Sequence, residues 1–324
     1  MSSVSDWKVP PSVQPKPQDY SYDLERALAS VVGLRTIIPA DAFTAETLGT
    51  ERAGNGVLIR DDIVLTIGYL ITEAESIWLS LIDGRVVPGH ALAYDQPTGF
   101  GLVQALARLD LPTLPLGQSG PAKIDDRVVV IGAGGRQHSV AARIVGKQEF
   151  AGYWEYVLDE AIFTAPAHPH WGGTAVIGAA GDLIGIGSLQ VEGMLKGGRS
   201  EPLNMVVPID LLKPILEDLL TLGRANRPPR PWLGIYATAM EDKVVLVGLA
   251  DDGPAERANL RTGDIVLAVA GTEVTELADL FRRIWALGNA GVEVPLTVYR
   301  DGRTFEVRVP SGDRNRFLKG PSLH

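Results

Sequence analysis

The fold of this chain is decided by the stretch from His168 to Gly187, which reads HPHWGGTAVIGAAGDLIGIG. A glycine-rich turn is followed by a short apolar run at 175–177, a second turn, and another apolar run at 183–186. Short apolar runs bounded by glycine turns are typical of β-hairpins. The stretch therefore predicts a hairpin inside a β-domain.

The composition is that of a globular protein of more than one domain. The chain has 324 residues, of which 45% are hydrophobic and 21% charged, and this length suggests two or three domains. A net charge of -9 argues against broad nucleic-acid binding. The absence of cysteine excludes disulfides, thiolate metal ligands and a cysteine nucleophile. No run approaches the roughly 20 apolar residues that span a bilayer.

Residues 1–22 are polar and contain four prolines, which predicts an extended proline-rich arm anchored by Trp7, Tyr20 and Tyr22, or else a disordered tail. The arm has no basic segment followed by an apolar one, so it does not read as a secretory signal. We therefore expect a cytoplasmic protein, or a periplasmic one if a leader has been removed.

Three segments before His168 extend the β pattern. Residues 54–71 read GNGVLIRDDIVLTIGYLI, two apolar strands around a polar turn, while residues 95–103 read DQPTGFGLV and residues 114–119 read LPLGQS. Together with the stretch around Trp171, they resemble the trypsin-fold serine proteases of the HtrA (DegP-like) branch. The resemblance implies a mostly β fold, with a double six-stranded β-barrel of the trypsin-like (chymotrypsin) type over residues 23–222.

The same resemblance marks four positions where the family's chemistry is missing. Trp171 stands at the nucleophilic serine, Tyr69 at the general-base histidine and Gly99 at the triad aspartate. Pro169 stands where the family uses a backbone N–H in its oxyanion hole, and proline has no N–H. An indole offers only an N–H donor, and a phenol with a pKa near 10 cannot replace imidazole as a base at neutral pH. The pattern therefore predicts a protease fold with no catalytic residues.

The last part of the chain resembles a PDZ domain. Residues 253–266 read GPAERANLRTGDIV, close to the PDZ signature, which predicts a linker at 223–231, a PDZ domain at 232–311 and a tail at 312–324. The resemblance implies that peptide C-termini bind between a carboxylate-holding loop and a helix expected at 276–287. The expected peptide-binding residues are Trp232, Leu233, Gly234 and Ile235 in the loop, and Leu280, Ile284 and Leu287 on the helix. The alternative for these three helix residues is that they face the core.

Other kinds of site are less well supported. The run VVVIGAGG at 128–135 lacks the third glycine and the βαβ pattern of a dinucleotide site, so a strand and turn are expected there. His168 and His170 with Ser188 would form a rearranged catalytic dyad only if a carboxylate oriented one of the histidines. A metal site at these histidines lacks a third ligand. The default for both histidines is a solvated loop, and for Trp171 a plug of the former pocket.

The expected function is thus a catalytically inactive HtrA-like protein that binds protein or peptide C-termini through its PDZ domain, without cofactor, metal or nucleic acid. The alternative is a serine endopeptidase of the HtrA type. Family resemblance further implies a homotrimer built on the barrel domain.

Overall fold

The computed structural model describes residues 7–195 and 198–320. The chain divides into two compact units. The barrel unit comprises Met1–Gln148, Glu160–Asn226 and Gly320–His324, and the sheet unit comprises Glu149–Asp159 and Arg227–Lys319. A short internal segment, 149–159, therefore belongs to the same unit as the C-terminal third of the chain.

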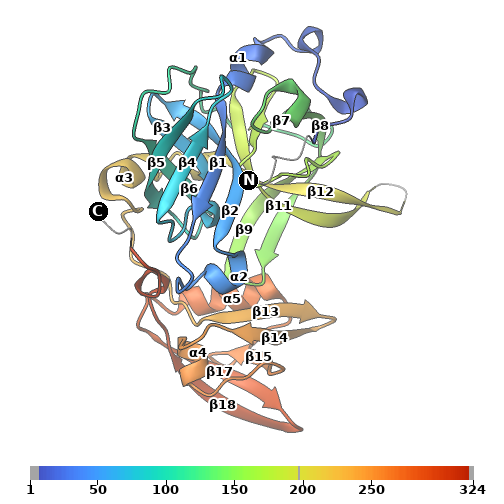
Figure 1. The fold of residues 1–324 in the computed structure, drawn as a ribbon. Coiled ribbons are helices and arrows are strands. Elements are labelled where there is room, and N and C mark those ends of the chain that lie inside the picture. Colours follow the sequence, from blue (N-terminus) through green and yellow to red (C-terminus); the bar gives the residue numbers. More distant parts are fainter. Residues whose placement is uncertain (1–6, 196–197, 321–324) are drawn as a thin grey trace. The chain divides into compact units, whose positions relative to one another are not determined.

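The first half of the barrel unit is a closed antiparallel barrel in the strand order β1-β2-β3-β6-β5-β4 (Figure 1). All five residues of β3 are buried, and its only polar side chain, Thr66, donates a 2.6 Å hydrogen bond to the Asn55 carbonyl. The barrel interior therefore satisfies its polar group locally. The strands are β1 Val31–Ile37, β2 Glu51–Arg60, β3 Ile63–Ile67, β4 Ser76–Ser80, β5 Val86–Tyr94 and β6 Phe100–Ala105.

The second half is another closed barrel, in the order β10-β11-β12-β9-β8-β7. The predicted hairpin of residues 168–187 forms its β10–β11 pair, with Ala175 opposite Ile186. Gly181 has φ +82° in the connecting turn, a conformation that glycine adopts without strain. The strands are β7 Arg127–Ile131, β8 Ser139–Gly152, β9 Tyr156–Ala165, β10 Ala175–Ile177, β11 Leu183–Leu195 and β12 Arg199–Pro208.

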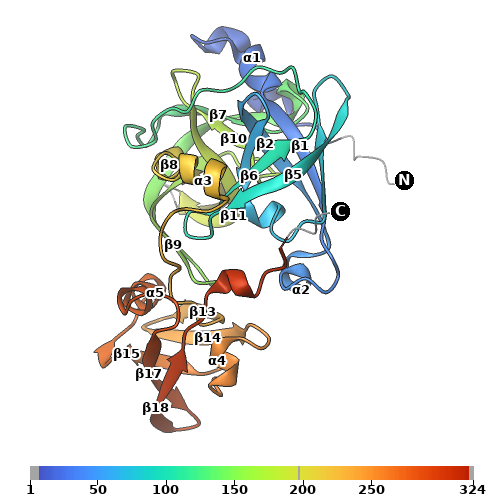
Figure 2. The ribbon, with the colours of Figure 1, turned by 90° about the vertical axis from the view of Figure 1, so that its left-hand side faces the viewer.

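The sheet unit contains an antiparallel sheet in the order β13-β14-β15-β17-β18, with β16 paired to β15. The helix α5 packs next to β13 and β15 (Figures 1 and 2). Its buried residues Ala278, Phe281 and Ile284 recur at helical spacing. The strands are β13 Ile235–Met240, β14 Lys243–Leu249, β15 Ile265–Val269, β16 Thr272–Glu273, β17 Glu293–Arg300 and β18 Arg303–Pro310.

The helices are short. The α-helices are α1 Leu24–Ala29, α2 Ala45–Leu48, α3 Leu216–Leu222, α4 Pro254–Arg257 and α5 Leu277–Ala286. The 3₁₀ turns are η1 Pro11–Val13, η2 Pro17–Asp19, η3 Gly68–Leu70, η4 Arg136–His138, η5 Ile209–Leu211 and η6 Arg314–Arg316. No helix in the described part of the chain is long and apolar enough to cross a membrane.

The mostly β, double-barrel prediction is confirmed. The run at 128–135 is a strand, β7, that pairs antiparallel with β8, so it is not part of a dinucleotide-binding βαβ unit. Residues 211–222 do not form one continuous helix despite their apolar spacing, because Pro214 disfavours the helical conformation of the residue before it. Only Leu216–Leu222 is α-helical.

The arm described from Trp7 onward packs on the second barrel. Val9 is buried in a cluster with Val128, Val130 and Val140, and its N–H donates to the Gln137 carbonyl at 2.8 Å. These contacts give the arm a fixed place on the barrel through Val9.

Candidate functional site

The loop 168–174 is held by two buried asparagines. The Asn55 side chain on β2 donates to the carbonyls of His170 and Gly172, at 2.9 and 3.0 Å, and accepts the Ala133 N–H at 2.8 Å. The Asn204 side chain on β12 accepts the His168 N–H at 2.6 Å and donates to the His168 carbonyl at 3.1 Å. Both barrels therefore fix the shape of this loop.

Gly173 within this loop must be glycine. Its φ is +76°, and a Cβ there would lie 1.8 Å from the Asn55 carbonyl oxygen. The glycine lets the loop approach β2 closely enough for the Asn55 hydrogen bonds to form.

Tyr69 lies in the turn η3 that follows β3, and this turn is anchored by a buried arginine. Arg52 is 5% exposed and donates to the carbonyls of Tyr69 at 2.6 Å and Thr72 at 3.1 Å. Burial lowers the pKa of Arg52 to about 10, while the Glu73 carboxylate acts in the opposite direction. Arg52 stays charged at neutral pH and holds the backbone on which Tyr69 is placed.

The structure brings Tyr69 and Trp171 together. The Tyr69 hydroxyl donates to the Ser188 carbonyl at 2.8 Å, and it also has a side-chain hydrogen bond with Trp171, in which the indole N–H is the donor. Burial raises the pKa of Tyr69, and the bond from Trp171 opposes that shift. The phenol is thus neutral and bonded on both sides.

Gly99 lies beside the same turn. Its carbonyl accepts the Gly68 N–H at 2.7 Å, and its φ is +84°. The three positions that sequence analysis assigned to the triad, Tyr69, Gly99 and Trp171, are therefore joined through contacts at η3. Pro169 lies two residues before Trp171 in the asparagine-held loop.

Both ring nitrogens of His168 are used in hydrogen bonds, so neither is available as a catalytic base. His168 is 1% exposed; its Nε2 bonds to the His138 carbonyl at 2.8 Å, and its Nδ1 accepts the His170 N–H at 3.1 Å. Burial lowers its pKa to about 4, so the ring is neutral. The expectation of a solvated loop is wrong for His168, because the arm and the barrel cover it.

Trp7 packs against the rings of His138, His168 and His170, at centroid distances of 5.7, 5.4 and 4.8 Å. Ser188 contributes its carbonyl to Tyr69. Within residues 7–195 and 198–320, no group of three or more histidine, cysteine, aspartate or glutamate residues is arranged to hold a metal ion.

In the sheet unit, the predicted carboxylate loop surrounds a carboxylate. The backbone N–H groups of Leu233, Gly234 and Ile235 donate to Glu155 Oε1 at 3.2, 2.7 and 3.1 Å. Gly234 has φ +74°, and a Cβ there would lie 3.0 Å from that of Ala250. Trp232 is buried and its ring lies 4.7 Å from that of Phe317.

The helix residues predicted to contact a peptide lie in or against the core of the sheet unit. Leu280 and Ile284 are fully buried in the core cluster of the sheet unit, while Leu287 is partly buried against it. The sequence offered no signal for Glu155, nor for Asn55 and Asn204, because their partners lie far away in the chain.

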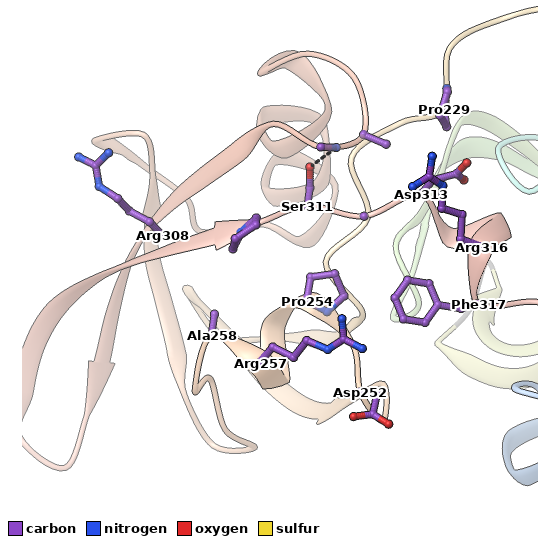
Figure 3. A pocket seen from close by; sticks show the side chains of 14 residues that line it. Pro229, Asp252, Pro254, Arg257, Ala258, Arg308, Ser311, Asp313, Arg316 and Phe317 are labelled. Carbon is purple, nitrogen blue, oxygen red and sulfur yellow. Dashed lines mark hydrogen bonds between the residues drawn. The ribbon is translucent and has the colours of Figure 1, made fainter.

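A separate hollow of about 1010 Å³ lies on the sheet unit between α4, the end of β18 and η6. Figure 3 shows Pro254, Arg257 and Phe317 around it, with Ser311 accepting the Gly291 N–H at 3.1 Å. The residues that line the hollow do not include the loop 232–235, so it is distinct from the carboxylate site.

Comparison with known families identifies both parts of the chain. The trypsin-like peptidase domain matches residues 54–186, and the PDZ domain matches residues 231–310. The chain is HtrA-like: a trypsin-like domain followed by a PDZ domain.

Relatives of the HtrA-like chain are named as proteases. A probable periplasmic DegP-like serine endoprotease of Pseudomonas fluorescens is 27% identical over 276 residues, which are 81% of this chain and 56% of that protein. The serine endoprotease DegS of Haemophilus influenzae is 24% identical over 85% of this chain and 81% of its own length. The chain spans just over half the length of the DegP-like relatives.

Solved structures share the fold. The HtrA-type protease AlgW with a decapeptide superposes with a TM-score of 0.55 at 22% identity, over 92% of this chain and 98% of that one. A serine endoprotease from Yersinia pestis gives 0.53 at 21% identity, over 90% and 98%. These structures show the fold. The names of the curated relatives favour the endopeptidase alternative over the inactive interpretation, so the loss of catalysis is a prediction from the residues.

Proposed function

We propose that this HtrA-like chain is a non-catalytic protein that binds peptide C-termini through its PDZ domain. The observation that carries the proposal is the Tyr69–Trp171 pair. At the positions assigned to base and nucleophile, it presents a neutral phenol and an indole, and the phenol is already bonded to the Ser188 carbonyl at 2.8 Å. Neither group can attack a peptide carbonyl at neutral pH.

A fluorophosphonate probe tests the loss of catalysis, because it labels only an activated serine. We expect no labelling of the full chain and no hydrolysis of casein, since removing a triad lowers turnover by about a million-fold. A DegP-like relative is the positive control. Stoichiometric labelling of any serine would favour the second candidate function, a serine endopeptidase, which the names of the relatives support.

The carboxylate loop supports the binding half of the proposal. Its N–H groups already converge on a carboxylate, that of Glu155, and PDZ domains hold a ligand's C-terminal carboxylate with such a loop. Apolar C-terminal peptides should bind the PDZ domain by itself, residues 228–312, with micromolar affinity, about 8 kcal/mol. Equal binding of a peptide acid and its amide would contradict use of this loop.

Location and assembly follow from the relatives as proposals. The DegP-like relatives are named as periplasmic, which favours the periplasmic alternative over the cytoplasmic expectation. Fractionation of the native host tests this location. The homotrimer remains a prediction that light scattering of the purified chain would check.

A further inference from the structure

Residues 149–159, which we call the hairpin tip, contact the carboxylate loop in the register of a PDZ ligand. Glu155 supplies the carboxylate. The Tyr153 carbonyl, two residues earlier, accepts the Ala237 N–H at 2.9 Å, and Ala237 lies two residues after Ile235 on β13. A ligand strand that adds to β13 and ends in the loop would make this pair of contacts.

Side chains of the hairpin tip add apolar and charged contacts. Val157 is 8% exposed and belongs to the same buried cluster as Leu280 and Ile284, the residues expected to line the peptide groove. On the exposed side of α5, Arg282 bonds to Glu149 and Asp159, each at 2.5 Å. The tip therefore resembles a bound peptide in carboxylate, backbone and apolar contacts.

The strained backbone of Glu155 indicates that this position uses a glutamate for its carboxylate and not for its backbone conformation. Its φ is +58°, a left-handed conformation that favours glycine or asparagine over glutamate. The side chain is nevertheless only 2% exposed, and the loop N–H groups offset the cost of the strained backbone. A glycine would suit this turn better but would leave those N–H groups without the carboxylate.

We propose that the hairpin tip is an internal ligand of the PDZ carboxylate loop, and that a peptide C-terminus binds only by displacing it. The inference rests on the proposed peptide-binding function. A tethered ligand acts at an effective concentration in the millimolar range, so a free peptide of micromolar affinity binds the intact chain more weakly than it binds the open loop. The partner is then a protein with an apolar C-terminus, present at a concentration that overcomes this competition.

The test compares full-length variants at pH 8, using a fluorescein-labelled hexapeptide with a free C-terminal valine. Glu155→Gly removes the carboxylate and keeps the left-handed turn, while Arg282→Glu places a like charge against Glu149 and Asp159. We expect both to bind the peptide at least about tenfold more tightly than the wild type. Glu160→Gln is the matched control, because Glu160 lies on the same hairpin but pairs with Lys147.

Amide hydrogen exchange at residues 233–235 supplies a readout that needs no peptide. We expect these amides to be protected in the wild type and the control, and to exchange faster in both variants. Equal peptide affinity and equal exchange in wild type and variants would overturn the internal ligand. Faster exchange without peptide binding in any protein would support the internal ligand and refute the proposed binding function.

Discussion

At the scale of single residues, Asn55 joins parts of the chain that are far apart. Its amide bonds to carbonyls 115 and 117 residues away, and its carbonyl oxygen accepts an N–H 78 residues away. Side-chain amides are suited to this task because they donate and accept at once. The position of Trp171 therefore depends on a residue of the first barrel.

Replacing Asn55 by alanine should destabilise the barrel unit. The change removes the side-chain hydrogen bonds to the His170 and Gly172 carbonyls and from the Ala133 N–H. The Gly172 carbonyl keeps the backbone N–H of residue 55, so the expected cost is about 2–4 kcal/mol. Urea unfolding measures the loss. Asn226→Ala is the control, because Asn226 is exposed and should change stability by less than about 0.5 kcal/mol. Equal effects of the two substitutions would contradict the role assigned to Asn55.

Glu155 should make peptide binding depend on pH. Burial raises the pKa of its carboxyl to about 7, against hydrogen bonds from Ile235, Leu233 and Gly234 and the charge of Arg314. Once released, Glu155 returns to an ordinary pKa near 4.3. Between pH values of about 4.3 and about 7, the docked carboxyl is therefore protonated while the released one is ionised. Raising the pH through that window favours release.

Peptide affinity of the full chain should therefore rise from pH 5 to pH 7.5, by at most about tenfold per pH unit. The peptide's own carboxylate stays ionised throughout, because its pKa is about 3.5. Glu155→Gln cannot titrate and should show a flat profile in fluorescence anisotropy. If the peptide affinity of the wild type fell with rising pH, deprotonation of Glu155 would not favour release of the hairpin tip.

At the scale of elements, the loop 168–174 leads into the β10–β11 hairpin, and its backbone and side-chain polar groups are used in hydrogen bonds within the barrel unit. Asn55 and Asn204 hold its backbone, and His168 is bonded at both ring nitrogens. The hairpin itself was predictable, since glycine turns and apolar runs are local signals. The asparagine contacts were not, because a long-range hydrogen bond leaves no periodic pattern in the sequence.

Restoring the triad should leave a poor enzyme. The triple variant Tyr69→His, Gly99→Asp and Trp171→Ser still has Pro169, which denies one oxyanion donor at a cost of about 3 kcal/mol. The Asp at position 99 would also occupy a φ of +84°, which strains its backbone. Adding Pro169→Gly should raise kcat on a fluorogenic peptide by about a hundredfold.

The control for this experiment is Pro169→Gly alone, which should remain inactive because no nucleophile is present. If the triple variant already matched an intact protease of this fold, the assignment of Pro169 to the oxyanion position would be wrong.

At the scale of the whole molecule, the sequence motifs predicted both parts of the chain and their order. The PDZ signature at 253–266 and the barrel turns are local patterns, and the strands they predict are present. What they could not predict is that residues 149–159 belong to the sheet unit. The pairing of Glu155 with Gly234 spans 79 residues, so no local pattern in the sequence indicates it.

This arrangement predicts how the sheet unit responds to heat. If the hairpin tip is its ligand, Glu155→Gly and Arg282→Glu should each lower its stability by about 1–2 kcal/mol. Such a loss lowers the transition temperature of a domain of this size by roughly 4–16 °C. The barrel transition should stay in place, since the two substituted residues belong to the sheet unit. Calorimetry of the full chain measures both transitions, with Glu160→Gln as the control.

Adding the valine-terminated peptide to Glu155→Gly at about 100 times its Kd should then raise the lowered transition temperature again, because a ligand at that excess stabilises by about 2.7 kcal/mol. If the transition temperature of the sheet unit were unchanged by both substitutions, the hairpin tip would not stabilise this unit as a ligand.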